Sequence, residues 1–496
     1  MKKTFIKMLP VIVAAVLLAT SCSKDNDNSV VTTPDNKEVT ETVTPASEGM
    51  QKTIPMTITV GKEGKSLSKS TVEVIDGAYK QKFIAGDVLV ISNDEVLASE
   101  AVFTLKSGDE GKETASFEGE LSVKADAELI KGTTKLNAVL KNTGSDVSKQ
   151  NNGVALTEVN EASSLAEAFE KYGYLTAASF TYNGDQTNIT LVQNTVFLKI
   201  KPFCGQSTAT INSKEYTKQS DGVIYLAVPS GTELTSNLLS GTKTVTCDDG
   251  KVVKNIDRSD VLPGSFSVSS GKTVHFSKGN LQYNSQSTPQ WFFAANQYDR
   301  ILDQGGNVSA SGTRDLFGWG TWLKGGNPMS NSVENSDYIW NSNGAAIGVQ
   351  WETLTADEWT YLLKSRTNAN SLRGYAQVNN VPGLIILPDT WTLPSGIEFS
   401  SVVNDKYQTN QYNAEQWKTM ENEGAVFLPS CGWRNPKENV VSQISGENIV
   451  GYYWSKTPDG ESSEKANDVT IASSSWYIPQ PHVKMDGFSV RLVHGL

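Results

Sequence analysis

The segment Thr53–Val60 reads TIPMTITV, and its alternating side chains decide the fold class of the first half of the chain. Apolar residues recur at every second position, which is the period of a strand with one face in a core. They are Ile54, Met56, Ile58 and Val60. Further strands are expected between turn-forming sequences such as DG, AGD and SGDEG. These strands are Thr71–Ile75, Asp87–Ile91, Ala101–Leu105 and Ala115–Leu121. Short strands at this spacing predict a mainly β fold built as a β-sandwich.

One segment of this half has helical rather than strand periodicity. In SSLAEAFEKYGYL the apolar residues follow a serine at a helix N-cap position, so we expect one short covering helix. They are Leu165, Ala168, Phe169 and Tyr172. Strands resume in ITLVQNTVFLKIKP, GVIYLAVP and KVVKNIDR, up to the turn at Leu262-Pro263-Gly264. We therefore place a β-sandwich region at residues 51–268, with room for two lobes that divide near residues 150–160.

A sharp change of composition marks the next boundary. All 11 tryptophans lie between Trp291 and Trp476, and the first arginine is Arg258. A second module is therefore expected at residues 269–496.

The amino terminus has the features of an export signal. In MKKTFIKMLPVIVAAVLLATSC, lysines precede an apolar stretch, Leu9–Ala19, that is too short to span a bilayer permanently. We interpret residues 1–21 as a signal peptide, and the ATSC ending resembles a lipobox, which would make Cys22 the lipid attachment point. The alternative is an ordinary secretory leader with an incidental cysteine. Residues 22–50 have almost no large apolar side chains and are expected to form a disordered tether. SKDNDN after Cys22 resembles the export tag of Bacteroidetes lipoproteins, which implies a lipid-anchored protein on the outer face of the outer membrane.

Net charge and cysteine content bear on which molecules the chain can bind and on whether it forms a disulfide. The net charge of -11 opposes binding to nucleic acid. Cys204 and Cys247 could pair in an oxidising exterior, although spacing alone leaves this open. Cys431 is expected to be a small buried residue.

Two family resemblances follow from these segments. FIAGDVLVIS, FTLKSGDEGKETASFEGEL and NTVFLKIKP, within residues 51–268, resemble the fimbrillin-like (Mfa-like) lipoproteins of Bacteroidetes pili. This resemblance implies transthyretin-like β-sandwich lobes and association with other pilus subunits by strand donation. Many shaft subunits of that family are trimmed by an arginine-specific protease, but here no arginine precedes Arg258.

The tryptophan-rich module carries the second resemblance. FSKGNLQY, DLFGWGTW, LTADEWTYLLKSR, GAVFLPSCGWR, GYYWS and GFSVRLV occur in the order seen in a C-type lectin-like module of Bacteroidetes surface lipoproteins. The residues themselves predict an α+β domain. Thr355 to Glu358 form a capping box before a helix with Trp359, Leu362 and Leu363 on one face. A second helix, YNAEQWKTMENEG, should bury Trp417 and Met420 and end at Gly424. Strands are expected in AVFLP, GYYWS, DVTIA and FSVRLV.

The module offers few groups for chemistry. His275, within TVHFS, is expected to face solvent from a strand, while His482 and His494 have no histidine or cysteine neighbour in sequence. The Glu-Pro-Asn, Gln-Pro-Asp and Trp-Asn-Asp tripeptides of calcium-dependent lectins are absent, and Pro479-Gln480-Pro481 lacks carboxylates. We therefore predict no metal, no cofactor and no enzymatic activity.

Aromatic side chains remain as candidate ligand contacts. Several lie in Gly-, Asn-, Ser- or Pro-rich stretches that usually form surface loops, where their faces could stack on sugars or peptides. These are Trp319, Trp322, Trp340, Trp433, Trp476 and Tyr477. The alternative for each is a place in the core. The remaining tryptophans considered, Trp291, Trp359, Trp391, Trp417 and Trp454, are assigned to the core.

The sequence thus predicts a pilus tip or accessory subunit that binds a glycan or a host protein through its C-terminal domain. The alternatives are a structural pilus anchor without an external ligand and, more remotely, a polysaccharide-active enzyme.

Overall fold

The computed structural model describes most of the chain after the tether. The described residues are 51–60, 71–75, 78–142, 155–173, 175–247, 252–284, 286–302, 312–319, 351–402, 407–435, 441–442, 449–472 and 475–496. They belong to one compact unit, Gln51–Leu496. The predicted signal peptide, Cys22 and the tether of residues 22–50 lie outside the described residues. No helix in the described part of the chain is long and apolar enough to cross a membrane.

The first lobe is built on one sheet with the strand order β10-β1-β6-β5-β4-β7-β9-β11. Its strands are β1 (Lys52–Val60), β4 (Asp87–Ser92), β5 (Ala101–Leu105), β6 (Ala115–Val123), β7 (Lys135–Asn142), β9 (Leu175–Thr181), β10 (Gln186–Ile189) and β11 (Val192–Gln193). A separate hairpin comprises β2 (Thr71–Ile75) and β3 (Ala78–Lys82). The strands predicted from the TIPMTITV segment and its successors are confirmed, with ends that differ by at most two residues.

This sheet curls back on itself. β10 and β11 stand at opposite ends of the strand order, yet only Thr190 and Leu191 separate them in sequence. The alternation in β1 places Met56, Ile58 and Val60 in the enclosed core. The sheet therefore surrounds a core of its own, whose largest fully buried members are Phe83, Phe103 and Phe117.

The second lobe has a smaller sheet covered by the predicted helix. Its strand order is β18-β12-β15-β8, made of β8 (Asn160–Ala162), β12 (Thr195–Lys201), β15 (Ile224–Pro229) and β18 (Val253–Asp257). Helix α1 (Leu165–Tyr172) begins after Ser164, whose side chain accepts a hydrogen bond from Glu167 N. Phe169 of α1 stacks on Phe197 of β12 with ring centroids 3.9 Å apart. Two hairpins complete this lobe: β13 (Thr208–Ile211) with β14 (Lys214–Thr217), and β16 (Thr232–Leu234) with β17 (Lys243–Val245).

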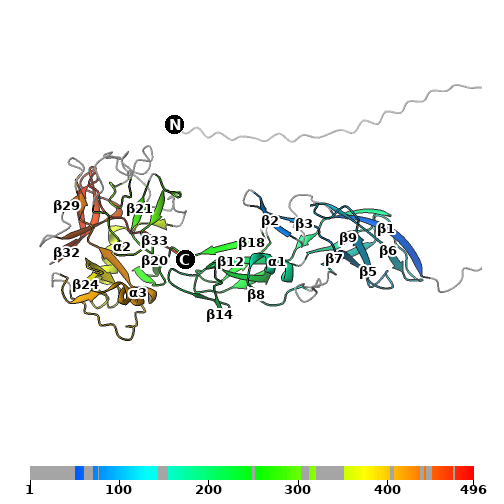
Figure 1. The fold of residues 1–496 in the computed structure, drawn as a ribbon, viewed down its shortest axis with the longest axis horizontal. Helices are drawn as coiled ribbons and strands as arrows, with labels where there is room; N and C mark the ends of the chain where they lie inside the picture. The colour runs from blue at the N-terminus through cyan, green and yellow to red at the C-terminus, as the bar shows by residue number, and fades with distance from the viewer. Residues whose placement is uncertain are drawn as a thin grey trace, which may run out of the picture. The chain divides into compact units, whose positions relative to one another are not determined.

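The remainder of the chain is an α+β region with several small sheets (Figure 1). One sheet has the order β19-β20-β33-β23, from β19 (Phe266–Ser269), β20 (Lys272–Phe276), β33 (Val493–His494) and β23 (Trp351–Glu352). A second has the order β26-β24-β25-β27, from β26 (Asn410–Tyr412), β24 (Arg373–Val378), β25 (Val381–Ile386) and β27 (Val426–Pro429). A third contains β30 (Val450–Pro458), β31 (Lys465–Ala472) and β32 (Ser475–Val483). Two short hairpins are β21 (Leu281–Tyr283) with β22 (Trp291–Phe293), and β28 (Trp433–Arg434) with β29 (Val441–Ser442).

Both predicted helices of this region form where their caps place them. Helix α2 (Ala356–Thr360) has the complete Thr355–Glu358 capping box and continues as a π-helical turn, η3 (Tyr361–Ser365). Helix α3 (Ala414–Asn422) has a second capping box, between Asn413 and Gln416, that the sequence analysis did not identify. One predicted strand is largely wrong: in FSVRLV only Val493 belongs to a strand, whereas Phe488 and Ser489 make single bridges. Its side chains are nevertheless buried, because apolar alternation reports burial as well as pairing.

Helix α3 ends in a Schellman motif, and the glycine of this motif also contacts the turn that precedes β19. Gly424 has a φ of 92°, its N–H bonds Glu421 O (2.9 Å), and the Ala425 N–H bonds Met420 O (3.0 Å). A Cβ on Gly424 would lie 2.4 Å from Cα of Gly264, in the turn before β19. Gly424 therefore serves two purposes: it adopts the left-handed conformation, and it allows two backbones to touch.

We expect Gly424→Ala to destabilise the protein by about 3 kcal/mol or more, because backbone strain adds to a collision between two main chains. Urea denaturation measures the loss. Gly271→Ala is the matched control, since Gly271 also has a positive φ (77°) but its added Cβ would meet nothing within 4 Å. That variant should lose only about 1 kcal/mol. Equal losses in the two variants would contradict the proposed contact.

Candidate functional site

The sheet of β30, β31 and β32 carries the candidate site. Strand register places Tyr452 opposite Thr470 and Trp454 opposite Asp468. Because side chains alternate along a strand, these four share one face of the sheet. Tyr453 points to the other face and is fully buried in the core.

His482 of β32 joins Asp468 on this face. Its Nδ1 lies 2.6 Å from Oδ2 of Asp468, and Thr470 Oγ1 donates to the other carboxylate oxygen at 2.9 Å. The Asp468 side chain is completely buried, whereas that of His482 is 31% exposed. Burial raises the pKa of Asp468, and the hydrogen bond and charge of His482 oppose this rise. An ionised carboxylate only accepts hydrogen bonds, so Nδ1 of His482 is the donor to an ionised Asp468.

Aromatic rings hold this imidazole in place. Tyr452 stacks on Phe488 with centroids 4.6 Å apart, and the His482 ring meets each of them nearly edge-on at 5.3 Å. Gly432 bridges Gly451, which brings the half-buried Trp433 next to the strand that carries Tyr452. A fixed hydrogen-bonding group beside partly exposed rings can bind a ligand that has a flat apolar face and polar edges, such as a sugar or a peptide.

The contacts of His482 show whether it is placed to activate a nucleophile. The hydrogen bond and ring contacts of His482 in the described part of the chain are with Asp468, Tyr452 and Phe488, and none of these is a serine, threonine or cysteine that it could activate as a nucleophile. Among the described residues there is also no group of three or more His, Cys, Asp and Glu side chains that could hold a metal ion. The expectation of a non-enzymatic protein without metal or cofactor stays a prediction.

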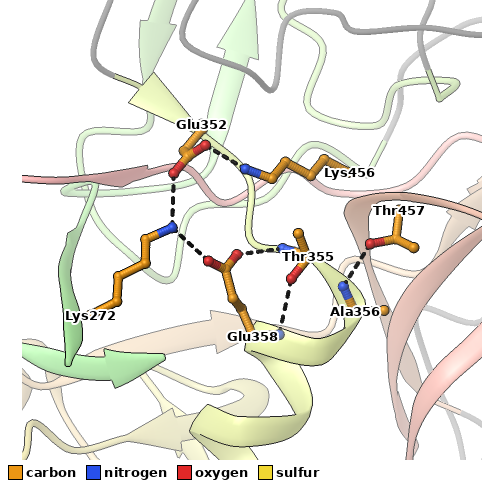
Figure 2. Close-up of polar contacts among 7 residues, drawn as sticks. All are labelled: Lys272, Glu352, Thr355, Ala356, Glu358, Lys456 and Thr457. Carbon is orange, nitrogen blue, oxygen red and sulfur yellow. Dashed lines mark hydrogen bonds and ion pairs between the residues drawn. The ribbon is translucent and has the colours of Figure 1, made fainter. Parts of the chain in front are cut away.

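An ionic network anchors the other end of β30. Figure 2 shows Glu352 of β23 between Lys272 and Lys456, while Glu358 of α2 lies between Lys272 and Thr355. Lys272 Nζ is 2.5 Å from Glu358 Oε1 and 3.4 Å from Glu352 Oε1. Four elements, β20, β23, α2 and β30, are thereby tied together.

The hydroxyl of Thr457 strengthens the same junction. It accepts a hydrogen bond from Ala356 N (3.0 Å), one of the N–H groups that the first turn of α2 cannot satisfy internally. Strand β30 is therefore fixed at its far end by the hydrogen bond to α2 and by the Lys456–Glu352 pair.

The structure reassigns part of the predicted aromatic surface. Trp319 is 3% exposed and donates its indole N–H to Ser455 O at 2.7 Å, so its prediction as a ligand contact is wrong. It packs in the core because its one polar atom has a partner there. Trp433 is half-buried, and Trp476 and Tyr477 lie in β32. Trp322 and Trp340, and the side chains of Trp476 and Tyr477, lie outside the described residues.

The tryptophans assigned to the core agree with the structure in all but one position. Trp291, Trp359, Trp417 and Trp454 are buried. Trp391 is half-buried and packs against the cluster that contains Trp417.

The structure also places three cysteines and two of the histidines. No disulfide joins Cys204 to Cys247: Cys204 packs against the core that contains Trp359, and the Cys247 thiol donates to Thr195 O at 3.3 Å. Cys431 is fully buried, as expected. The prediction of a solvent-facing His275 is wrong, because β20 is covered on both faces and His275 is 7% exposed. His494, without a partner in sequence, lies directly opposite His275.

Comparisons with known proteins give limited similarity. A family model described as a domain of unknown function (DUF8237) matches residues 402–493. A search of the curated proteins finds no match. Among solved structures, the chain is similar to a fimbrial assembly protein from Parabacteroides distasonis, with 9% identity, coverage of 46% of this chain and 95% of that one, and a TM-score of 0.22. It is also similar to a fimbrial protein from Bacteroides ovatus, with 12% identity and a TM-score of 0.21. This match covers 90% of this chain and 100% of that one.

The network around α2 generates a pH-dependent prediction. Burial raises the pKa of Glu358, but hydrogen bonds from Lys272 and the Thr355 N–H outweigh it and hold the pKa below the ordinary value of 4.5. A depressed carboxylate pKa stabilises the fold above the unfolded-state value, and this contribution is lost as the pH falls through the folded-state value. Glu358→Gln keeps an oxygen for Thr355 N but removes the charge. We expect it to cost about 1 kcal/mol at neutral pH.

Denaturation curves across the acidic range test this prediction. The stability difference between the wild type and Glu358→Gln should shrink as the pH falls below about 4.5, since both proteins are then neutral at this position. Glu415→Gln, which alters an exposed first-turn residue of α3, is the control and should show a smaller difference at neutral pH. A pH-independent loss in Glu358→Gln would refute the ionic origin.

Proposed function

We propose that the chain is a lipid-anchored, surface-exposed subunit of a pilus, fimbrillin-like in its first two lobes. In this proposal it occupies a tip or accessory position and binds a glycan or a protein through residues 269–496. The lipobox-like Cys22, the tether, the two β lobes and the tryptophan-rich α+β domain follow one another in the order that such a role requires.

The observation that carries this proposal is the place of β1 in the first lobe. β1 pairs with β6 along all nine of its residues, Lys52–Val60, and also with β10 in parallel over four residues, Thr57–Val60. Its side chains Met56, Ile58 and Val60 fill the core of that lobe. The strand that follows the predicted tether thus lies between β6 and β10, and in this proposal a strand from another subunit could take that place only if β1 left it.

The absence of early arginines agrees with retention of β1. An arginine-specific protease has no site before Arg258 in this sequence. A subunit that keeps its first strand can offer a strand to a neighbour but cannot receive one in this lobe. Such a subunit terminates a chain of strand donations, which favours a terminal position over one in the shaft.

The ligand-binding part of the proposal rests on the face around His482. The exposed part of this imidazole, held by Asp468 and flanked by Tyr452, combines a directed hydrogen bond with an aromatic surface. The burial of Trp319 favours the second candidate function, a structural anchor whose C-terminal domain contacts only other subunits, because it removes one predicted ligand contact.

The terminal position predicts an intact amino terminus in the native protein. We expect mass spectrometry of the protein isolated from its own cells to find a lipid-modified Cys22 and the complete segment of residues 51–60. A native protein that begins after Val60 would contradict retention of β1. Recombinant chain treated with an arginine-specific protease is the control, and it should keep β1 because its first cleavable site is Arg258.

The binding role predicts that Tyr452 contributes to ligand affinity. Residues 51–496 applied to an array of glycans and matrix proteins, with and without calcium, should bind at least one class of ligand. Tyr452→Ala should weaken that binding by about tenfold or more, as expected for an aromatic contact at the centre of an interface. Tyr361→Ala, which alters another half-buried tyrosine of the same domain, should bind like the wild type. Silence across the array would favour the anchor role, and equal losses in both variants would place the ligand elsewhere.

A further inference from the structure

Two buried histidines face each other where the last strand of the sequence enters its sheet. β33 lies between β20 and β23, and His494 is the register partner of His275 on one side and of Trp351 on the other. In an antiparallel pair, directly opposite residues have Cβ atoms about 4.5–5.5 Å apart. Like charges at such positions repel each other, so the pair is compatible with closure only while at least one imidazole is neutral.

His275 joins β20 to the second lobe. Its Nδ1 lies 3.2 Å from Leu262 O, and its ring stacks on Phe203 with centroids 5.1 Å apart and planes 15° apart. It is 7% exposed. A proton on this ring would place a charge beside Phe203 and the backbone of Leu262 and Pro263, none of which is a counter-ion.

His494 has even fewer polar contacts. It is 5% exposed, its ring meets Trp351 edge-on at 5.1 Å, and its buried Nδ1 has no hydrogen-bond partner. An unpartnered buried nitrogen costs free energy in the closed sheet and gains water or a proton when the sheet opens. The closed arrangement therefore disfavours proton uptake at this position.

The charges around the pair reinforce this effect. Arg258, in the segment after β18, acts on both histidines as a like charge. The nearby carboxylates are already engaged: Glu352 of β23 by Lys272 and Lys456 (Figure 2), and Asp260 by Lys278 at 2.8 Å. Cys204, on the loop that carries Phe203, is a thiol whose pKa burial raises, so it supplies no anion either.

We propose that His275 and His494 form an acid-sensitive closure, in which proton uptake releases β33 from β20 and loosens the contact between β20 and the Phe203 loop. This device is independent of the ligand-binding and pilus roles proposed above. The carrying observation is the cross-strand pairing of two buried imidazoles, one with a nitrogen that has no hydrogen-bond partner, within the electrostatic reach of the half-buried Arg258.

The direction of the response follows from linkage. Burial lowers the pKa of His275 and lowers that of His494 to about 4, against an ordinary value of 6.5. A histidine whose pKa is depressed stabilises the closed form above its ordinary value and opposes closure as the pH falls below it. For His494 alone, the ratio of open to closed sheet should rise roughly twentyfold between pH 7 and pH 5.

Hydrogen exchange of the chain of residues 51–496 tests the proposal. After correction for the intrinsic pH dependence of exchange, amides in peptides covering 272–277, 351–354 and 490–496 should exchange roughly twentyfold faster at pH 5 than at pH 7. Peptides from β1 and β6 of the first lobe provide the internal reference. Equal corrected rates at the two pH values in the wild type would overturn the proposal.

Substitutions distinguish the contribution of His275 and His494 to the acid response from that of His482. The double variant His275→Gln, His494→Gln should lose the acid response, whereas His482→Gln should keep it. If the double variant does not fold, Arg258→Gln provides the second test: it retains both histidines, removes their repulsive neighbour and should reduce the response. Retention of the full response in the double variant, or in Arg258→Gln, would refute the assignment, as would its loss in His482→Gln.

Discussion

The C-terminal domain depends on one pairing: two residues at the end of the sequence, Val493 and His494, form a strand between β20 and β23. β20 lies more than two hundred residues earlier, so this sheet cannot form until most of the domain has been gathered. The ionic network of Lys272, Glu352, Glu358 and Lys456 then joins the same strands to α2 and β30. Long-range pairing of this kind is costly in loop entropy, and the surrounding cores of fully buried side chains must offset it.

The period-two pattern allowed the first lobe to be predicted with close strand ends, because one face of each strand meets a core and the other meets solvent. It failed in FSVRLV, where Phe488, Val490 and Leu492 are buried but mostly lack strand partners. Helices were predictable wherever a cap preceded an apolar face, as at Ser164 and Thr355. The closure of the first sheet could not be predicted, because no local sequence pattern indicates that β10 and β11, only two residues apart, lie at opposite ends of the strand order.

The candidate site was less predictable. The pair of His482 and Asp468 depends on the diagonal register between β31 and β32, and the two residues are fourteen positions apart in the sequence. Alternation could have suggested that both residues lie on strands, but only pairing brings them together. Trp319 was misassigned because glycine-rich surroundings resemble a loop, while its indole N–H finds Ser455 O inside the domain. His275 was misassigned because both faces of β20 are covered, which a single strand cannot reveal.

The pairing of β1 also has a mechanical meaning. A lipid anchor and tether would transmit any pull on the molecule to the first residues of β1, where the strand begins at Lys52. A pull directed along this strand loads the hydrogen bonds to β6 and β10 in shear, so that many must break together rather than one after another. Under such a load the first lobe would resist tension applied at Lys52, and its resistance would depend on the whole nine-residue register with β6 rather than on any single contact.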